Sequence, residues 1–163
     1  MMIRENNNWN GKYVIKRINA KTREVIKEEI IYNRILDTAL NEMANALYDG
    51  SNDIVIGYLG VGTTTASIYN TTTSLGSETF RTAISVDSTV SNIGEVKNVF
   101  YILSTEAKFH VREMGIYAGS TATSTIGTGK LISIISWDSD RTIVDEEVQI
   151  TRYDSFNRST KVR

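Results

Sequence analysis

The residue types best suited to chemistry are few, and the first is a lone histidine. His110 is the only histidine among 163 residues, and the chain contains no cysteine. A Ser-His-Asp triad would have to include His110, yet it stands between Phe109 and Val111 in a segment typical of a strand, with no nucleophile-elbow motif nearby. A zinc site would need further nitrogen or sulfur ligands. We therefore expect a packed or half-exposed strand histidine.

A glycine-rich segment with a lysine raises the alternative of nucleotide binding. In a P-loop, a glycine precedes the Gly-Lys pair by five positions, and a serine or threonine after the lysine holds magnesium. Around Gly129-Lys130 these places are occupied by Ser124 and Leu131. The segment also leads into a predicted strand, whereas phosphates bind at a helix N-terminus. A glycine turn is the better interpretation, and we predict no cofactor and no small-molecule substrate.

A run of carboxylates could provide an acid and a base, or ligands for calcium. It consists of Asp138, Asp140, Asp145, Glu146 and Glu147. Their spacing does not fit an EF-hand loop. The two aspartates around Ser139 fit a turn, and the glutamates fit the solvated side of a strand. We predict no metal site and no enzymatic activity, with calcium binding left open as the alternative.

Composition narrows the class of protein further. The formal net charge is -1 at pH 7, so no overall field attracts the chain to nucleic acid or to an acidic membrane. No apolar run approaches the roughly 20 residues that span a bilayer. Proline is absent, so Gly, Asn, Asp and Ser must form the turns. Frequent threonine and serine favour strands and polar loops over helices.

The periodicity of apolar residues predicts the elements that carry these side chains. Segments 12–18 and 24–31 alternate around the turn-forming residues 19–22, which indicates an N-terminal β-hairpin. An apolar stripe at three- and four-residue spacing predicts one helix over about residues 33–48, with Asn33 as its N-cap and Gly50 as its end. The stripe contains Ile35, Leu36, Ala39, Leu40, Met43, Ala44 and Leu47.

Six further segments have strand character, namely 54–61, 80–86, 95–103, 109–117, 130–137 and 146–153. The polar segment 63–77 is predicted to be a long surface loop or an arm over a neighbour. Together the elements predict a mainly β fold, a β-sandwich with one covering α-helix. We expect a single domain over residues 12–154, a flexible N-terminal arm over 1–11 and a basic C-terminal arm over 155–163.

The strand 95–103 indicates contact with other subunits because it is apolar on both faces. Val96, Phe100 and Ile102 form one face, and a strand buried on both faces needs a second covering layer or a neighbour. The residues predicted to form an interface are Val99, Tyr101, Leu103, Phe156 and Arg158. The predicted assembly is a trimer or larger symmetric ring of this chain.

Read in order, five segments resemble a family of small phage structural proteins, close to the N-terminal domain of tail-collar fibre proteins. Segment 33–47 is similar to the family's opening helix, and 56–65 (IGYLGVGTTT) to its strand and glycine-threonine loop. Segment 75–84 (LGSETFRTAI) resembles its Leu-x-x-Glu-x-Phe-Arg motif. Segments 109–117 (FHVREMGIY) and 129–132 (GKLI) are similar to its Arg-Glu-x-Gly strand and the glycine-led strand that follows.

The resemblance implies a virion structural protein, a docking or adaptor subunit of a tail, collar or fibre attachment site. Its partners would be itself and other virion proteins, and it would be located in the virion. A head fibre or capsid decoration protein is the alternative of the same class. A free carbohydrate-binding β-sandwich, using Trp9, Tyr69 and Trp137, is the alternative of another class. The family motif falls on Gly60, Gly62, Glu78, Arg81, Arg112, Glu113 and Gly115.

The motif residues have a structural interpretation on a strand. Arg112 and Glu113 are adjacent, so their side chains point to opposite faces and need partners elsewhere, for which Glu78, Arg81 or another subunit are candidates. Gly115 allows a close backbone approach or a bulge.

Overall fold

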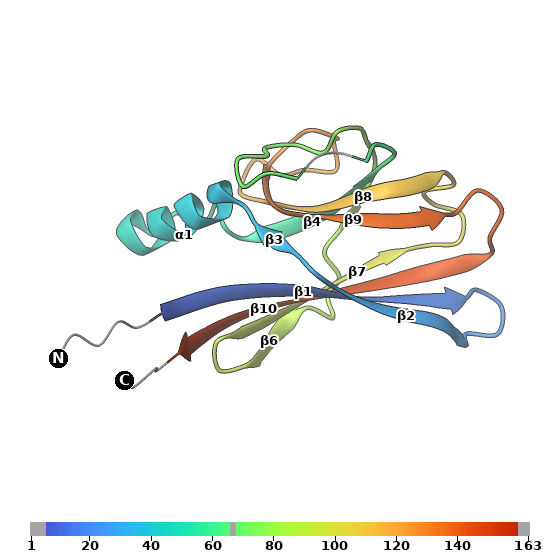
Figure 1. The fold of residues 1–163 in the computed structure, drawn as a ribbon, viewed down its shortest axis with the longest axis horizontal. Helices are drawn as coiled ribbons and strands as arrows, with labels where there is room; N and C mark the ends of the chain where they lie inside the picture. The colour runs from blue at the N-terminus through green and yellow to red at the C-terminus, as the bar shows by residue number, and fades with distance from the viewer. Residues whose placement is uncertain (1–5, 66–67, 160–163) are drawn as a thin grey trace.

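The computed structural model describes residues 6–65 and 68–159 and consists of two antiparallel sheets packed face to face (Figure 1). Each sheet has five strands, and the described residues contain one helix. The predicted β-sandwich with one helix and an N-terminal hairpin is therefore confirmed. Within the same ranges, no helix has the length and apolar character needed to cross a membrane.

The first sheet contains both ends of the described chain. Its strand order is β2-β1-β10-β7-β6. The bounds are β1 Asn6–Asn19, β2 Val25–Tyr32, β6 Thr89–Asn92, β7 Glu95–Ile102 and β10 Glu146–Ser159. The hairpin between β1 and β2 closes as predicted, because the Asn19 side chain accepts the backbone N–H groups of Lys21 and Thr22 at 2.9 Å each.

The second sheet has the order β3-β9-β8-β4-β5. Its bounds are β3 Arg34–Ile35, β4 Ile56–Gly62, β5 Glu78–Ala83, β8 His110–Ala118 and β9 Lys130–Asp140. Alternate side chains of the two sheets, such as Tyr13, Phe100 and Met114, meet in a core from which solvent is excluded. This burial is the main stabilising contribution to the sandwich.

The outer face of the second sheet is covered by the chain itself. Leu75 packs there with Leu36, Tyr117 and Leu131 in a second apolar cluster. The segment before β5 runs over β8 and β9 in Figure 1. Segment 63–77 was predicted to be a surface loop or an arm over a neighbour. At Leu75 it instead covers the second sheet of its own chain.

The helix α1, Asp37–Asp49, begins later than predicted. Asn33 is not its N-cap: Arg34 and Ile35 pair with β9 as β3, and Leu36 occupies the N-cap position with no side-chain hydrogen bond. The sheet pairing satisfies backbone groups that a helix would otherwise use. The predicted end is confirmed, since Gly50 adopts a left-handed conformation with φ of 75°.

The predicted arms also need correction where they are described. In the β1–β10 register, Asn6 pairs with Ser159 and Trp9 with Phe156, so residues 6–11 and 155–159 belong to the sheet. Composition indicated too little apolar area for order, but the ladder supplies backbone hydrogen bonds that composition does not count. The predictions for residues 1–5 and 160–163 lie outside the described residues.

Candidate functional site: an apolar pocket at one end of the sandwich

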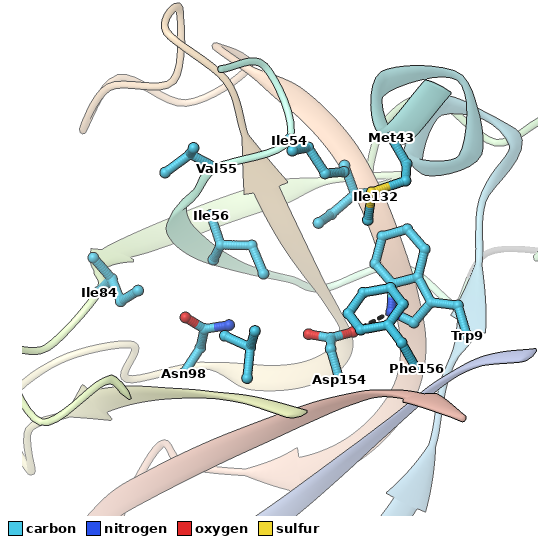
Figure 2. A pocket seen from close by; sticks show the side chains of 11 residues that line it. Trp9, Met43, Ile54, Val55, Ile56, Ile84, Asn98, Ile132, Asp154 and Phe156 are labelled. Atoms are coloured by element: carbon cyan, nitrogen blue, oxygen red, sulfur yellow. Dashed lines mark hydrogen bonds between the residues drawn. The ribbon is translucent and has the colours of Figure 1, made fainter. Parts of the chain in front are cut away.

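A pocket of about 340 Å³ opens between the sheets at the end where α1 lies (Figure 2). Met43 of α1 and residues 54–56, which lead into β4, form one side. Val96 of β7 and Ile84 line it as well. Its walls are predominantly apolar, as in sites that bind small molecules or inserted side chains.

Two aromatic side chains on paired strands form the rim of the pocket. The rings of Trp9 and Phe156 lie 5.2 Å apart between centroids, tilted by 38°. Phe156 was predicted as an interface residue, and 40% of its surface is exposed. Aromatic side chains at the edge of an apolar pocket are common anchors in protein interfaces.

The floor of the pocket is polar and incompletely bonded. Asp154 is 2% exposed and Asn98 is 5% exposed. Oδ1 of Asp154 accepts hydrogen bonds from Nε1 of Trp9 at 2.7 Å and Nη2 of Arg152 at 2.6 Å. Within the described part of the chain, Oδ2 of Asp154 and Nδ2 of Asn98 have no hydrogen-bond partner. Native structures leave few buried polar atoms in this condition, so each one calls for an explanation.

Behind the floor, a charged network extends into the core. Arg152 is fully buried, and its Nη1 donates to Oγ of Ser133, which also shares a 2.8 Å hydrogen bond with the Tyr13 hydroxyl. Burial lowers the pKa of Arg152, but the Asp154 carboxylate and hydrogen bonds raise it more, so the guanidinium stays charged. Burial raises the pKa of Tyr13, whose hydroxyl keeps its proton.

A buried ion pair is weak evidence for stability, because well-packed apolar side chains often serve as well or better. Arg152 and Asp154 therefore suggest a role beyond stability. The hydrogen bond from Arg152 fixes the Asp154 carboxylate beneath the pocket. One carboxylate oxygen accepts this bond, and the other is unpaired.

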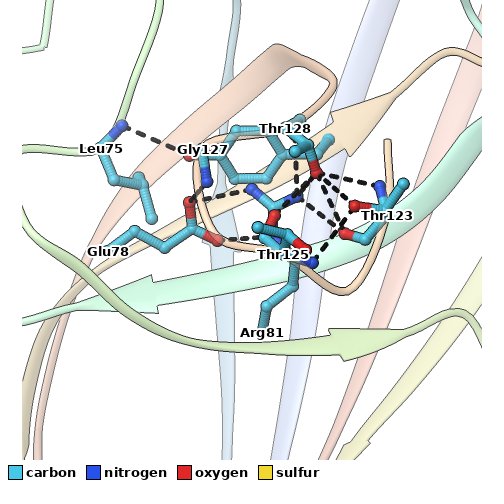
Figure 3. Close-up of polar contacts among 8 residues, drawn as sticks. Leu75, Glu78, Arg81, Thr123, Thr125, Gly127 and Thr128 are labelled. Carbon is cyan, nitrogen blue, oxygen red and sulfur yellow. Dashed lines mark hydrogen bonds and ion pairs between the residues drawn. The ribbon is translucent and has the colours of Figure 1, made fainter. Parts of the chain in front are cut away.

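The motif residues Glu78 and Arg81 come together outside the pocket (Figure 3), and Gly60 lies against the Glu78 side chain. Nε and Nη2 of Arg81 donate to the two carboxylate oxygens of Glu78 at 2.6 and 2.9 Å. Nη1 of Arg81 donates to the Thr128 carbonyl at 2.8 Å, and the guanidinium lies 4.0 Å from the Tyr117 ring centroid. This buried cluster holds the loop between β8 and β9.

Among the remaining motif residues, Gly62, Glu113 and Gly115 are also structural. Arg112 is exposed and Glu113 buried, as the strand alternation predicted. Neither Glu78 nor Arg81 is the partner of Glu113, which instead accepts the backbone N–H groups of residues 76 and 77 at 2.8 and 2.7 Å. A Cβ on Gly62 would meet the Glu113 side chain. On Gly115 it would lie 2.6 Å from Cδ1 of Leu131, which confirms the predicted close approach.

The predicted interface residues do not form one surface. Val99 is 1% exposed, whereas Tyr101 and Leu103 are 36% and 49% exposed. The chain itself covers part of this strand, since the Val99 N–H donates to Oγ of Ser88 at 2.9 Å. Arg158 lies in β10, and its side chain is outside the described residues.

His110 and Lys130 both have structural partners. His110 is half-exposed and pairs with Asp138. Nζ of Lys130 donates to Glu42 at 2.8 Å and to Asp53 at 2.9 Å, so it anchors α1 to the second sheet. Among residues 6–65 and 68–159, no group of three or more His, Cys, Asp or Glu side chains could hold a metal ion.

A comparison with models of known families, with curated proteins and with solved structures found no match to this chain. Sequence reasoning missed Asn98, Arg152 and Asp154. The sequence did contain a signal for Arg152 and Asp154. These two charged residues interrupt a row of apolar residues on one face of the strand, which consists of Val148, Ile150 and Phe156.

Proposed function

We propose that this chain is a structural protein of a bacteriophage particle, a docking or adaptor subunit at the tail, collar or fibre attachment site. The observation that carries the proposal is the spatial continuity of the segments that resemble the phage family. They supply β4, β5, β8, the start of β9 and the β3–α1 segment. All four strands and β3 belong to the second sheet, so segments scattered in sequence form one unit.

A docking role is also supported by apolar surface at the α1 end. The predicted stripe of α1 is only partly covered, since Leu40 is 53% exposed and Leu47 is 83% exposed. Tyr48 beside them is 92% exposed. Exposed apolar side chains on one helix are compatible with a site of protein–protein contact.

The structural roles of the polar clusters favour a binding subunit over an enzyme. Arg81, Glu113 and Lys130 are each engaged in holding loops or the helix in place. A head fibre or capsid decoration subunit is compatible with the same features and stays the alternative within the class. A carbohydrate platform is less favoured, because Trp137 is 2% exposed and its indole donates to Glu29.

Mass spectrometry of purified particles tests the proposal. Particles should be prepared from a phage or induced prophage that carries the gene, beside particles from a deletion of the gene. We expect peptides of this chain in a fixed ratio to the capsid protein, and defective assembly or attachment after the deletion. Particles that lack the chain and remain infectious would contradict the proposal.

The predicted trimer or larger ring is tested separately by native mass spectrometry of the purified chain and by the symmetry of its density in the particle. A monomer in both settings would contradict that part of the proposal and leave the particle assignment intact.

A further inference from the structure

We propose that the pocket at the α1 end receives a tyrosine side chain of a partner protein. The inference deepens the proposed function and rests on it for the identity of the partner as another virion protein. The chemistry of the pocket follows from its floor and walls alone.

The floor contains one unpaired donor and one unpaired acceptor, both buried beneath the pocket surface. Nδ2 of Asn98 can donate a hydrogen bond, and Oδ2 of Asp154 can accept one. A single hydroxyl group that reaches the floor would satisfy both atoms, because it accepts through its oxygen and donates its proton. A carboxylate ligand would be repelled by Asp154, and an ammonium group would leave Asn98 unpaired.

The register of the strands places the two polar side chains next to each other on the inner face of the sheet. Asn98 pairs with Arg152, and Val96 pairs with Asp154, so Asn98 and Asp154 are diagonal neighbours on the inner face of the sheet. Such neighbours are about 7–8 Å apart between Cα atoms. In Figure 2 the Asn98 amide nitrogen and the second Asp154 oxygen are directed toward each other.

The walls of the pocket favour a ligand in which the hydroxyl is attached to an aromatic ring. Trp9 and Phe156 at the rim offer aromatic faces, and Met43 offers a polarizable thioether. A volume of about 340 Å³ is at the small end for ligand pockets and suits one inserted side chain better than an oligosaccharide. Tyrosine combines a flat apolar ring with a terminal hydroxyl, and it is enriched among interface anchors.

The test uses p-cresol as the side-chain analogue of tyrosine and toluene as the matched analogue without the hydroxyl. Both are titrated into the full chain and followed by ¹H–¹⁵N NMR. The chain has two tryptophans, so the two indole N–H signals serve as internal reporters. The Trp9 signal should shift, since Trp9 lines the pocket and donates to Asp154, whereas the Trp137 signal should not.

We expect p-cresol to bind about tenfold more tightly than toluene, the effect of hydrogen bonds to buried groups that are otherwise unpaired. Asn98→Leu removes the donor and should reduce this preference severalfold while keeping the fold. Met43→Ala is the matched control, because it removes an apolar contact and should weaken both ligands by a similar factor. The preference in the unmodified chain is decisive by itself if Asn98→Leu fails to fold.

Three results would overturn the inference: equal binding of toluene and p-cresol, no binding of either, or stronger binding of methyl glucoside, which would identify a sugar site. Failure of the inference is distinguishable from failure of the proposed function, because the NMR titration tests only the pocket and particle mass spectrometry tests only membership of the virion.

Discussion

Removal of the Asp154 carboxylate should destabilise the protein strongly, because it leaves the buried Arg152 guanidinium without its charged partner. Arg152 is fully buried and its Nη2 lies 2.6 Å from Oδ1 of Asp154. Breaking a buried pair by removing one partner costs about 3–5 kcal/mol. Asp154→Ala also removes the acceptor of the Trp9 indole, so we expect an effect in the upper part of that range.

The double variant Arg152→Met/Asp154→Leu separates the cost of an unpaired charge from the value of the pair. Apolar replacement of a buried pair is often neutral or stabilising by about 1–4 kcal/mol. We therefore expect the double variant to be at least as stable as the unmodified protein, although Asp154→Ala alone is not. Its loss of p-cresol binding would then report the functional role of the carboxylate.

Urea unfolding monitored by tryptophan fluorescence measures both variants. With a slope near 2 kcal/mol per M, a loss of about 4 kcal/mol lowers the midpoint by about 2 M. The slopes must agree among variants for the comparison to hold. A loss below about 1 kcal/mol for Asp154→Ala, or a double variant less stable than the single one, would refute the reasoning.

Three further perturbations test the motif residues and the helix anchor. Gly60→Ala would place a Cβ 2.9 Å from Cε2 of Tyr117 and should lower the free energy of unfolding in urea by about 1–3 kcal/mol. The control is Gly57→Ala on the same strand, where the added Cβ meets nothing closer than 4.0 Å. This variant should change the free energy of unfolding by less than about 0.5 kcal/mol. Glu113→Ala leaves two backbone N–H groups without their acceptor and should cost about 2–4 kcal/mol, with a smaller loss in Glu113→Gln. The hydrogen bond from Lys130 lowers the pKa of Asp53 from its ordinary 3.8, so its stabilising contribution is present above that value and is lost as the pH falls through the lowered pKa. The melting temperature of Asp53→Asn should therefore fall less than that of the unmodified protein between about pH 5 and pH 2; equal falls would contradict the anchor.

Local sequence patterns correctly predicted the elements that depend only on residues close together in the chain. The alternating hairpin around Asn19 and the end of the helix at Gly50 depend on short-range hydrogen bonds and on the conformational freedom of glycine. The strand β6 was missed because Thr89–Asn92 has no apolar alternation and is ordered by pairing with β7. The helix start was placed too early because β9 competes for residues 34 and 35.

The candidate site was harder to predict than the fold. Phe156 was identified as an interface residue from its apolar character, and the structure places it at the rim of the pocket. In the sequence, Asn98 is an ordinary polar residue on the strand face that also contains Val96, Phe100 and Ile102. Its importance depends on a diagonal neighbour in β10, more than fifty residues away, and strand pairing alone creates that proximity.

The sequence by itself determined the mainly β class, the hairpin, the helix end and the close approach at Gly115, since these follow from side-chain periodicity and local backbone geometry. Only the tertiary structure decided that both ends of the described chain form paired strands, that the α1 stripe is partly exposed, and that Asn98 and Asp154 share the floor of an apolar pocket. The physical reason is that the burial of a residue and the pairing of its polar atoms depend on its neighbours in space. Strand order and register determine which residues those neighbours are.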